Sequence, residues 1–127
     1  MLKRATTARL TAAAIVLGAM VGCASAPIAG RLTLPGQEPD RVILSYRSSL
    51  LGGSGKLWTT LPAGERFTGT YVLQPGGRDA HMTGTLAGDR GGVMVCRFRL
   101  NEPGVGPDKG GTVRCDLSTG GVFDASF

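Results

Sequence analysis

The sequence predicts an all-β domain, a small antiparallel meander of about seven or eight strands that forms a barrel or a sandwich. Glycine is abundant, at 21 of 127 residues, and much of it stands in short clusters that divide the chain into segments. Between the clusters, Val, Thr, Phe and Tyr alternate with polar residues, as in strands with one face on a core. Beyond an N-terminal apolar run, no long window has a helical period.

The strands follow one another with turn residues between them. The expected strands are residues 31–34, 41–48, 56–61, 66–73, 81–86, 91–100, 111–117 and 122–127. Pro35, Gly36 and Pro39 separate the first two, and their backbone preferences suit a turn. In the strand 91–100 the apolar side chains occupy alternate positions, so the opposite face is expected to meet water.

The N-terminal segment has the pattern of an export signal. Lys3, Arg4 and Arg9 make its start basic, and residues 10–21 are all apolar or small. A membrane-spanning helix needs about 17–25 such residues, so this run is short for an anchor. A basic start, a short apolar run and an exit of small residues are typical of a secretory signal.

The exit from this run, Met20-Val21-Gly22-Cys23, resembles the lipobox of bacterial lipoproteins, with Met20 in place of the usual leucine. The resemblance implies that Cys23 is acylated and becomes the mature N-terminus. The chain then divides into a signal peptide (1–22), a short lipid-anchored tether (23–30) and a single β domain (31–127). The alternative is an ordinary secreted protein with an unrelated cysteine.

A lipobox also implies a location. Stable anchoring takes two or more lipid chains, and an acylated N-terminal cysteine supplies them without a spanning helix. In this family an aspartate directly after the cysteine favours the inner membrane, and Ala24 stands there instead. The resemblance therefore implies a lipid anchor in the outer membrane of a Gram-negative cell, with the domain facing the periplasm. Apart from this covalent lipid we expect no cofactor.

The net charge of +5 overstates how basic the mature chain is. Three of the 14 basic residues lie in the expected signal, which leaves 11 against nine acidic residues. The pattern shows no basic stripe interleaved with aromatic residues, so we expect no nucleic-acid partner.

With Cys23 acylated, Cys96 and Cys115 remain as a pair, and an oxidising compartment favours a disulfide between them. Two free thiols or two metal ligands are the alternatives, and the single histidine, His81, brings no ligand partner at metal spacing. Both cysteines stand on the apolar sides of their strands. If they face each other across a hairpin, Phe98 faces Val113.

The stretch Leu61…Gly64-Glu-Arg-Phe-Thr-Gly-Thr-Tyr71, with the C-terminal cysteine pair, resembles small β-rich lipoproteins of proteobacterial envelopes. The resemblance covers most of residues 50–127. It implies a fold and a location, and it implies no activity.

The sequence offers little catalytic chemistry. "GGSGKL" lacks the Ser or Thr of a phosphate-binding loop, because Leu57 stands in that place. His81 has Asp79 and Asp124 as potential partners, but no spacing identifies a serine nucleophile. Glu65 and Asp89 follow turn glycines and are more typical of turn caps. We therefore expect no enzyme, and a small envelope hydrolase is kept as an alternative.

The expected function is binding, as a non-enzymatic accessory domain for an envelope protein or glycan. The predicted site is a flexible loop, Gly52–Trp58, whose Ser54, Lys56 and Trp58 suit recognition. "GGSGK" also resembles the Ser-Gly loop with a nearby lysine in periplasmic lysozyme inhibitors, which is a further alternative. On the wet face, Arg97, Arg99 and Arg114 are candidates for a small basic patch that meets lipid head groups or a partner, and the commoner alternative is a merely solvated face.

Overall fold

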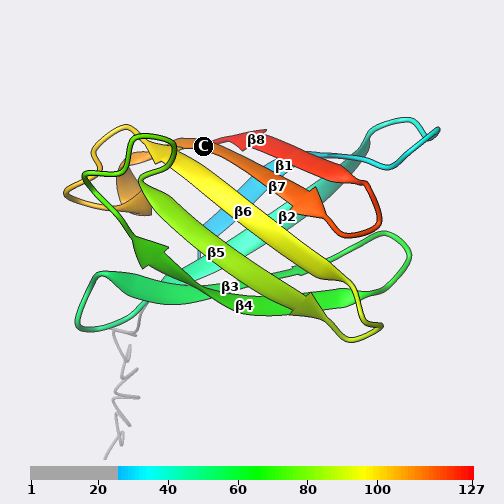
Figure 1. Cartoon of the computed structure of the whole chain (residues 1–127), viewed down its shortest axis with the longest axis horizontal. Coiled ribbons are helices and arrows are strands. Elements are labelled where there is room, and N and C mark those ends of the chain that lie inside the picture. The colour runs from blue at the N-terminus through cyan, green and yellow to red at the C-terminus, as the bar shows by residue number, and fades with distance from the viewer. Residues whose placement is uncertain (1–25) are drawn as a thin grey trace, which may run out of the picture.

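The computed structural model describes residues 26–127 and shows eight antiparallel strands closed into a barrel (Figure 1). Each strand pairs with the next along the chain, and the last pairs with the first, so no sheet edge is left open. The elements are β1 (Ala26–Thr33), β2 (Asp40–Ser48), β3 (Ser54–Thr60), β4 (Arg66–Leu73), β5 (Met82–Gly88), β6 (Val93–Leu100), the short 3₁₀ helix η1 (Pro107–Lys109), β7 (Gly111–Leu117) and β8 (Val122–Ser126). The all-β prediction is confirmed, as a barrel rather than a sandwich.

The first strand starts earlier than the sequence indicated. β1 begins at Ala26, so residues 26–30, expected in the tether, are already strand. Ala26 lies opposite Tyr46 of β2, and Ile28 is buried in the core. Ala, Pro and Gly around Ile28 have low strand preference, which hid this start. The expected signal peptide, residues 1–22, and Cys23 lie outside the described residues. In residues 26–127 no helix is long and apolar enough to cross a bilayer.

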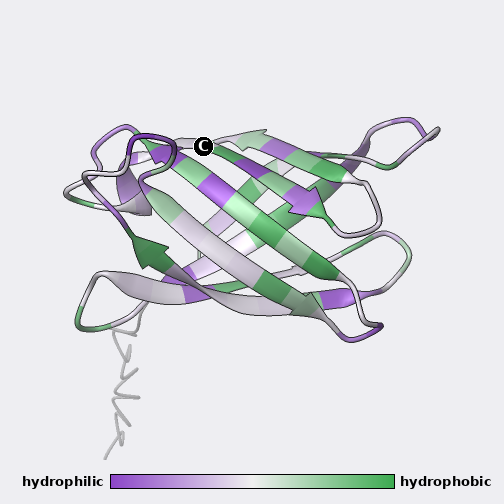
Figure 2. Cartoon of the chain, viewed as in Figure 1, coloured by the Kyte–Doolittle hydropathy of each residue, from purple (hydrophilic) through white to green (hydrophobic). Residues whose placement is uncertain are grey.

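The core fills the barrel with inward-facing side chains, and Figure 2 shows apolar and polar residues alternating along the strands. One inward row crosses six strands in register: Gly55, Tyr71, Gly84, Cys96, Cys115 and Phe123. Small residues therefore stand on both sides of the Tyr71 ring, which lets its bulk fit inside a narrow barrel.

Cys96 and Cys115 form a disulfide between directly opposed positions of β6 and β7, with their Cα atoms 4.0 Å apart. Both are fully buried, and Phe98 lies opposite Val113. The predicted pairing and register are confirmed, and the two alternatives for these cysteines, free thiols and metal ligands, are excluded.

The two ends of the barrel differ. We call one the long-loop end: it holds Ala26, the C-terminus and the connections 49–53, 74–81 and 101–110. The other, the short-turn end, holds the connections 34–39, 61–65, 89–92 and 118–121. At the long-loop end the β6–β7 connection crosses the barrel mouth, because Asp108 of η1 accepts a hydrogen bond from the Tyr46 hydroxyl of β2, at 2.9 Å.

At the short-turn end two hairpins are held together by carboxylates. Glu65 Oε2 accepts hydrogen bonds from the backbone N–H groups of Arg90, at 3.1 Å, and Gly92, at 3.0 Å. Asp89 Oδ1 accepts one from the backbone N–H of Arg66, at 3.0 Å. Both carboxylates therefore cap turns, as their positions after turn glycines indicated.

We expect Glu65→Ala to lower the free energy of unfolding by about 1.5–3 kcal/mol, because it removes the charged acceptor of two backbone donors. Urea denaturation followed by circular dichroism measures this change. Glu38→Ala, at an exposed site with no side-chain hydrogen bond in the described residues, is the control and should change stability by less than about 0.5 kcal/mol. Equal effects from the two variants would contradict a stabilising role for the hydrogen bonds that Glu65 accepts.

Candidate functional site

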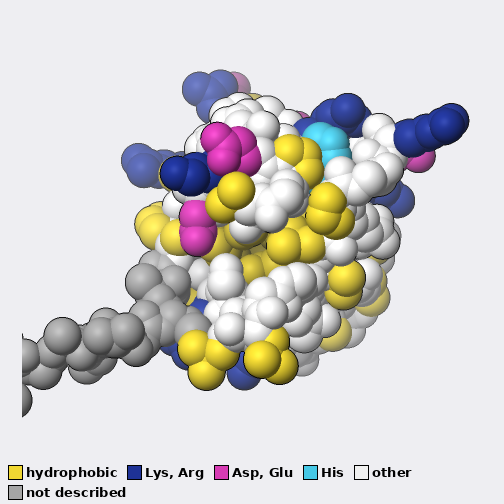
Figure 3. Space-filling view, turned by 90° about the vertical axis from the view of Figure 1, so that its left-hand side faces the viewer, with side chains coloured by type: hydrophobic (Ala, Val, Ile, Leu, Met, Phe, Trp, Pro, Cys, Tyr) yellow, Lys and Arg dark blue, Asp and Glu magenta, His cyan; other side chains and the backbone are white. Residues whose placement is uncertain are grey.

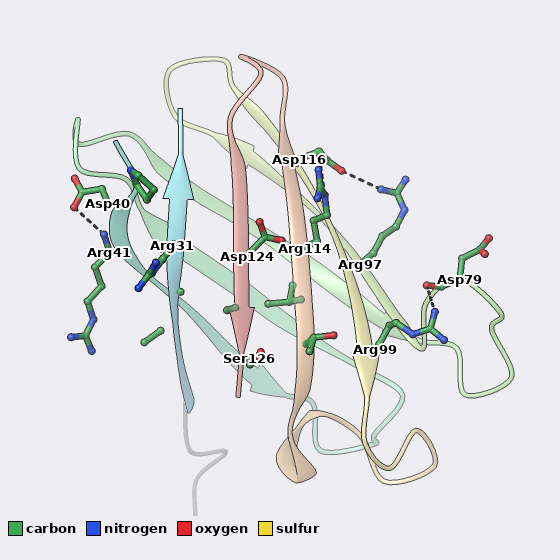
Figure 4. A pocket seen from close by; sticks show the side chains of 16 residues that line it. Arg31, Asp40, Arg41, Asp79, Arg97, Arg99, Arg114, Asp116, Asp124 and Ser126 are labelled. Atoms are coloured by element: carbon green, nitrogen blue, oxygen red, sulfur yellow. Dashed lines mark hydrogen bonds and ion pairs between the residues drawn. The ribbon is translucent and has the colours of Figure 1, made fainter. Parts of the chain in front are cut away.

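A groove with a volume of about 1090 Å³ lies on the outer face of β6, β7, β8, β1 and β2 (Figure 4). Arginines from four of these strands line it: Arg31, Arg41, Arg97, Arg99 and Arg114. We call this surface the arginine groove. Four aspartates and the hydroxyl groups of Thr112 and Ser126 also line it.

The central part of the arginine groove is one row of outward side chains in register across five strands. Arg97 of β6 lies opposite Arg114 of β7, which lies opposite Asp124 of β8. Asp124 lies opposite Arg31 of β1, which lies opposite Arg41 of β2. The row thus reads Arg-Arg-Asp-Arg-Arg, and all five side chains are exposed.

Four aspartates line the arginine groove, but few of its arginines form salt bridges with them in the described chain. Within residues 26–127 the salt bridges join Asp116 to Arg97, at 3.5 Å, and to Arg114, at 3.7 Å. All three side chains are about half exposed or more, so these pairs add little to stability. In the same part of the chain, Arg31 and Arg41 form no salt bridge.

Two like-charged pairs therefore lie directly opposite each other, Arg97 with Arg114 and Arg31 with Arg41. Like charges at opposed positions of neighbouring strands destabilise a sheet. Guanidinium groups bind carboxylate and phosphate with paired hydrogen bonds, so an anion between such arginines would relieve the repulsion. The row can therefore hold an anionic ligand.

The predicted binding residues are placed differently from the expectation. Ser54, Lys56 and Trp58 are not on a flexible loop, because residues 54–58 belong to strand β3 and only 49–53 form the turn. The glycines of this stretch suggested a loop, but Gly55 is a buried strand position beside the Tyr71 ring. A side chain on Gly55 would collide with that ring and with the backbone of β2.

The three residues do share the outer face of β3, as alternation requires. Leu57 is buried and Trp58 faces outward, as predicted from the sequence. The Arg47 guanidinium lies over the Trp58 ring, 5.9 Å from its centroid. Lys56 and Trp58 line a second, smaller hollow of about 420 Å³ on β3 and β4. It shares no lining residue with the arginine groove.

His81 stands just before β5, at the long-loop end. Its Nδ1 accepts a hydrogen bond from the backbone N–H of Leu100, at 2.9 Å. Within the described residues, the His81 side chain forms this one hydrogen bond. Asp124 lies in the arginine groove, and Asp79 lies at its edge, where the Asp79 backbone carbonyl accepts a hydrogen bond from Arg99. Among residues 26–127 no three His, Cys, Asp or Glu side chains are grouped to hold a metal ion.

Sequence reasoning found Arg97, Arg99 and Arg114 but missed Arg31 and Arg41. Arg31 joins the other arginines only because β8 pairs with β1 and closes the barrel. Pairing between the two ends of a chain leaves no local pattern. The alternation of Arg31 with Leu32 is a local signal for an outward side chain at Arg31, but it indicates no neighbour across the closure.

Two buried tyrosines support the mouth of the barrel beneath η1. Tyr46 and Tyr71 meet edge to face, with ring centroids 6.5 Å apart, and the Tyr71 hydroxyl donates a hydrogen bond to Ser48. Burial raises the pKa of both above the usual value for tyrosine. The neighbouring carboxylate of Asp108 raises the pKa of Tyr46 further.

This predicts a loss of stability in alkali. The folded state holds the hydroxyl protons of the two tyrosines more tightly than the unfolded state does. The stabilisation that results is fully present below the pKa of tyrosine in the unfolded chain, about 10, and it is lost as the pH rises through the higher pKa values of the folded state. We expect the free energy of unfolding to fall above pH of about 10. These are the only two tyrosines of the chain, so tyrosinate absorbance follows them directly. Tyr46→Phe should reduce the alkaline loss, and an unchanged pH profile in that variant would contradict the assignment.

Comparisons with protein-family models, with curated proteins and with solved structures found no match to this chain.

Proposed function

We propose that this protein is a lipoprotein, anchored by acylated Cys23 in the outer membrane and facing the periplasm, that binds an anionic envelope ligand without catalysis. The ligand class is a saccharide carrying several carboxylate or phosphate groups. The observation that carries the proposal is the row Arg97-Arg114-Asp124-Arg31-Arg41, which keeps two pairs of opposed arginines on one exposed surface.

The dimensions of the row favour an extended ligand. Neighbouring strands lie about 4.8 Å apart, so the four steps from β6 to β2 span about 20 Å. A single small anion would engage one arginine pair and leave the other unused. A chain with repeated anionic groups engages both arginine pairs at once, and linking the two contacts raises the overall affinity for the ligand.

The anchor rests on the lipobox resemblance. The start of β1 at Ala26 is three positions after Cys23, a reach of about 10 Å when fully extended. An acylated Cys23 would therefore hold the barrel against its membrane. Mass spectrometry of the mature N-terminus tests this step, and a mature chain that starts beyond Cys23 without acyl mass would overturn it.

Binding is tested with a carboxylated polysaccharide, a phosphorylated oligosaccharide and neutral dextran as probes. We expect the two anionic probes to bind and dextran to fail. Raising the salt concentration should weaken binding, because the charges of the groove are exposed to solvent. Equal binding of dextran, or no binding of either anionic probe, would overturn the proposed ligand class.

A further inference from the structure

The turn between β2 and β3 places two adjacent leucines in nearly full contact with solvent. The backbone N–H of Gly52 donates to the carbonyl of Ser49, at 3.1 Å, which makes Leu50 and Leu51 the two central residues of a β-turn. Their exposed fractions are 91% and 99%. Exposing two large apolar side chains to water is unfavourable, so this position calls for an explanation.

The other connections show how unusual this is. Each contains a turn closed by the same kind of backbone hydrogen bond, and their central pairs follow ordinary turn chemistry. The central pairs of those six turns are Pro35-Gly36, Pro62-Ala63, Pro75-Gly76, Asp89-Arg90, Pro103-Gly104 and Ser118-Thr119. Only the β2–β3 turn carries two large apolar residues at its centre.

The turn is held firmly by its neighbours. The backbone N–H of Ser49 donates to the carbonyl of Ser54, at 2.9 Å, and that of Leu73 donates to the carbonyl of Gly53, at 2.8 Å. These bonds tie the turn to β3 and to the end of β4. The leucines therefore project from a fixed support, which lowers the ordering cost of burying them elsewhere.

Basic residues stand directly behind the leucines. Arg47 of β2 lies opposite Lys56 of β3, and both are exposed on the outer face of the hairpin. No acidic residue occurs between Arg41 and Thr60. Trp58 lies further along the same face beneath Arg47. An apolar tip followed by cations and an aromatic residue is the order of groups that suits a membrane surface.

The tip also lies at the end of the barrel from which the chain leads back toward Cys23. β1 begins there, and Ala26 pairs with Tyr46 two residues before the end of β2 (Figure 1). Figure 3 looks onto this long-loop end, where hydrophobic and basic side chains lie together at the lower rim beside the start of the described chain.

We infer that the β2–β3 turn is a membrane-docking tip: Leu50 and Leu51 enter the acyl boundary of a bilayer, and Arg47 and Lys56 meet the lipid phosphates. The orientation rests on the proposed anchor at Cys23, which brings this end to the membrane. The anchor supplies the attachment, and the tip sets the angle of the barrel. The arginine groove, on the side wall of the barrel, then stays open to the periplasm.

The test moves the single tryptophan to the tip. The mature protein carrying Leu51→Trp and Trp58→Phe is mixed with vesicles of phosphatidylethanolamine and phosphatidylglycerol, with and without brominated acyl chains. A matched variant carries Val93→Trp and Trp58→Phe, because Val93 is an exposed apolar residue at the short-turn end. We expect a blue shift and strong bromine quenching for the first variant and neither for the second. Adding Leu50→Ser to the first should reduce the quenching at least severalfold.

Flotation of the same samples reports the anchor separately. Flotation without quenching at the tip would overturn the docking tip and leave the anchor standing, with the leucines facing water or a protein. Failure to float would overturn the anchor. In that case the docking tip would stand only if the Leu51→Trp variant were still quenched more strongly than the Val93→Trp variant at high lipid concentration. Equal quenching of the two variants would overturn the docking tip as well as the anchor.

Discussion

Replacing Cys96 and Cys115 together by alanine is expected to lower the free energy of unfolding by about 3–5 kcal/mol, the largest stability effect of any change considered for this barrel. The disulfide closes a loop with a sequence separation of 19 residues. Closing a loop of this size restricts the unfolded chain by about 3 kcal/mol in the chain-entropy account. Urea denaturation with and without reductant measures the difference.

Lost packing lowers the stability further, because both cysteines are fully buried. Their neighbours in the inward row cannot move into the space that the sulfur atoms leave. Gly84, beside Cys96, has no side chain to move into the gap, and the Phe123 ring beside Cys115 is rigid. The removed sulfur atoms therefore leave a cavity, which carries its own cost.

Two controls separate these causes. Thr112→Ala changes an exposed side chain on the outer face of β7 and should cost less than about 0.5 kcal/mol. Reductant should destabilise the native protein and leave the double alanine variant unchanged. If reductant left the native protein as stable as before, the disulfide would have no part in holding the barrel.

The cysteine pair also shows what the sequence can predict. β6 and β7 alternate clearly, so the inward positions of Met94, Cys96, Phe98 and Val113 follow from period-two patterning alone. The register followed from one assumption, that the two cysteines face each other. Local alternation together with one covalent constraint was therefore enough for this hairpin.

Other features could not be predicted because they depend on contacts between distant segments. Closure of the barrel by β1 and β8 brings Arg31 to Asp124, and no local signal marks that pairing. The glycine cluster near residue 55 indicated a loop, although Gly55 is a strand position that admits the Tyr71 ring. Glycine has low strand preference, and only the aromatic neighbour across the strands explains its use here.

The arginine groove has the largest expected effect on binding, through the opposed pair Arg97 and Arg114 of β6 and β7. We expect Arg97→Gln with Arg114→Gln to weaken binding of the carboxylated polysaccharide by about a hundredfold, since a hydrogen bond to a charged group is worth about 1.5–3 kcal/mol and 1.4 kcal/mol is tenfold in affinity. Glutamine keeps much of the arginine length and adds no negative charge beside Asp116. The fold should persist, because the two salt bridges that are lost are solvent-exposed.

The control pair is Arg66→Gln with Lys109→Gln, which removes the same charge from exposed positions outside the groove. If binding depended only on net charge, both pairs would weaken it equally. If the opposed arginines form the site, the control should lose no more than about twofold, from the weaker long-range attraction that remains after salt screening. Isothermal titration calorimetry with matched melting curves measures both variants. Equal losses of affinity would mean that binding depends on the net charge of the whole barrel. The Arg-Arg-Asp-Arg-Arg row would then have no role as a binding site.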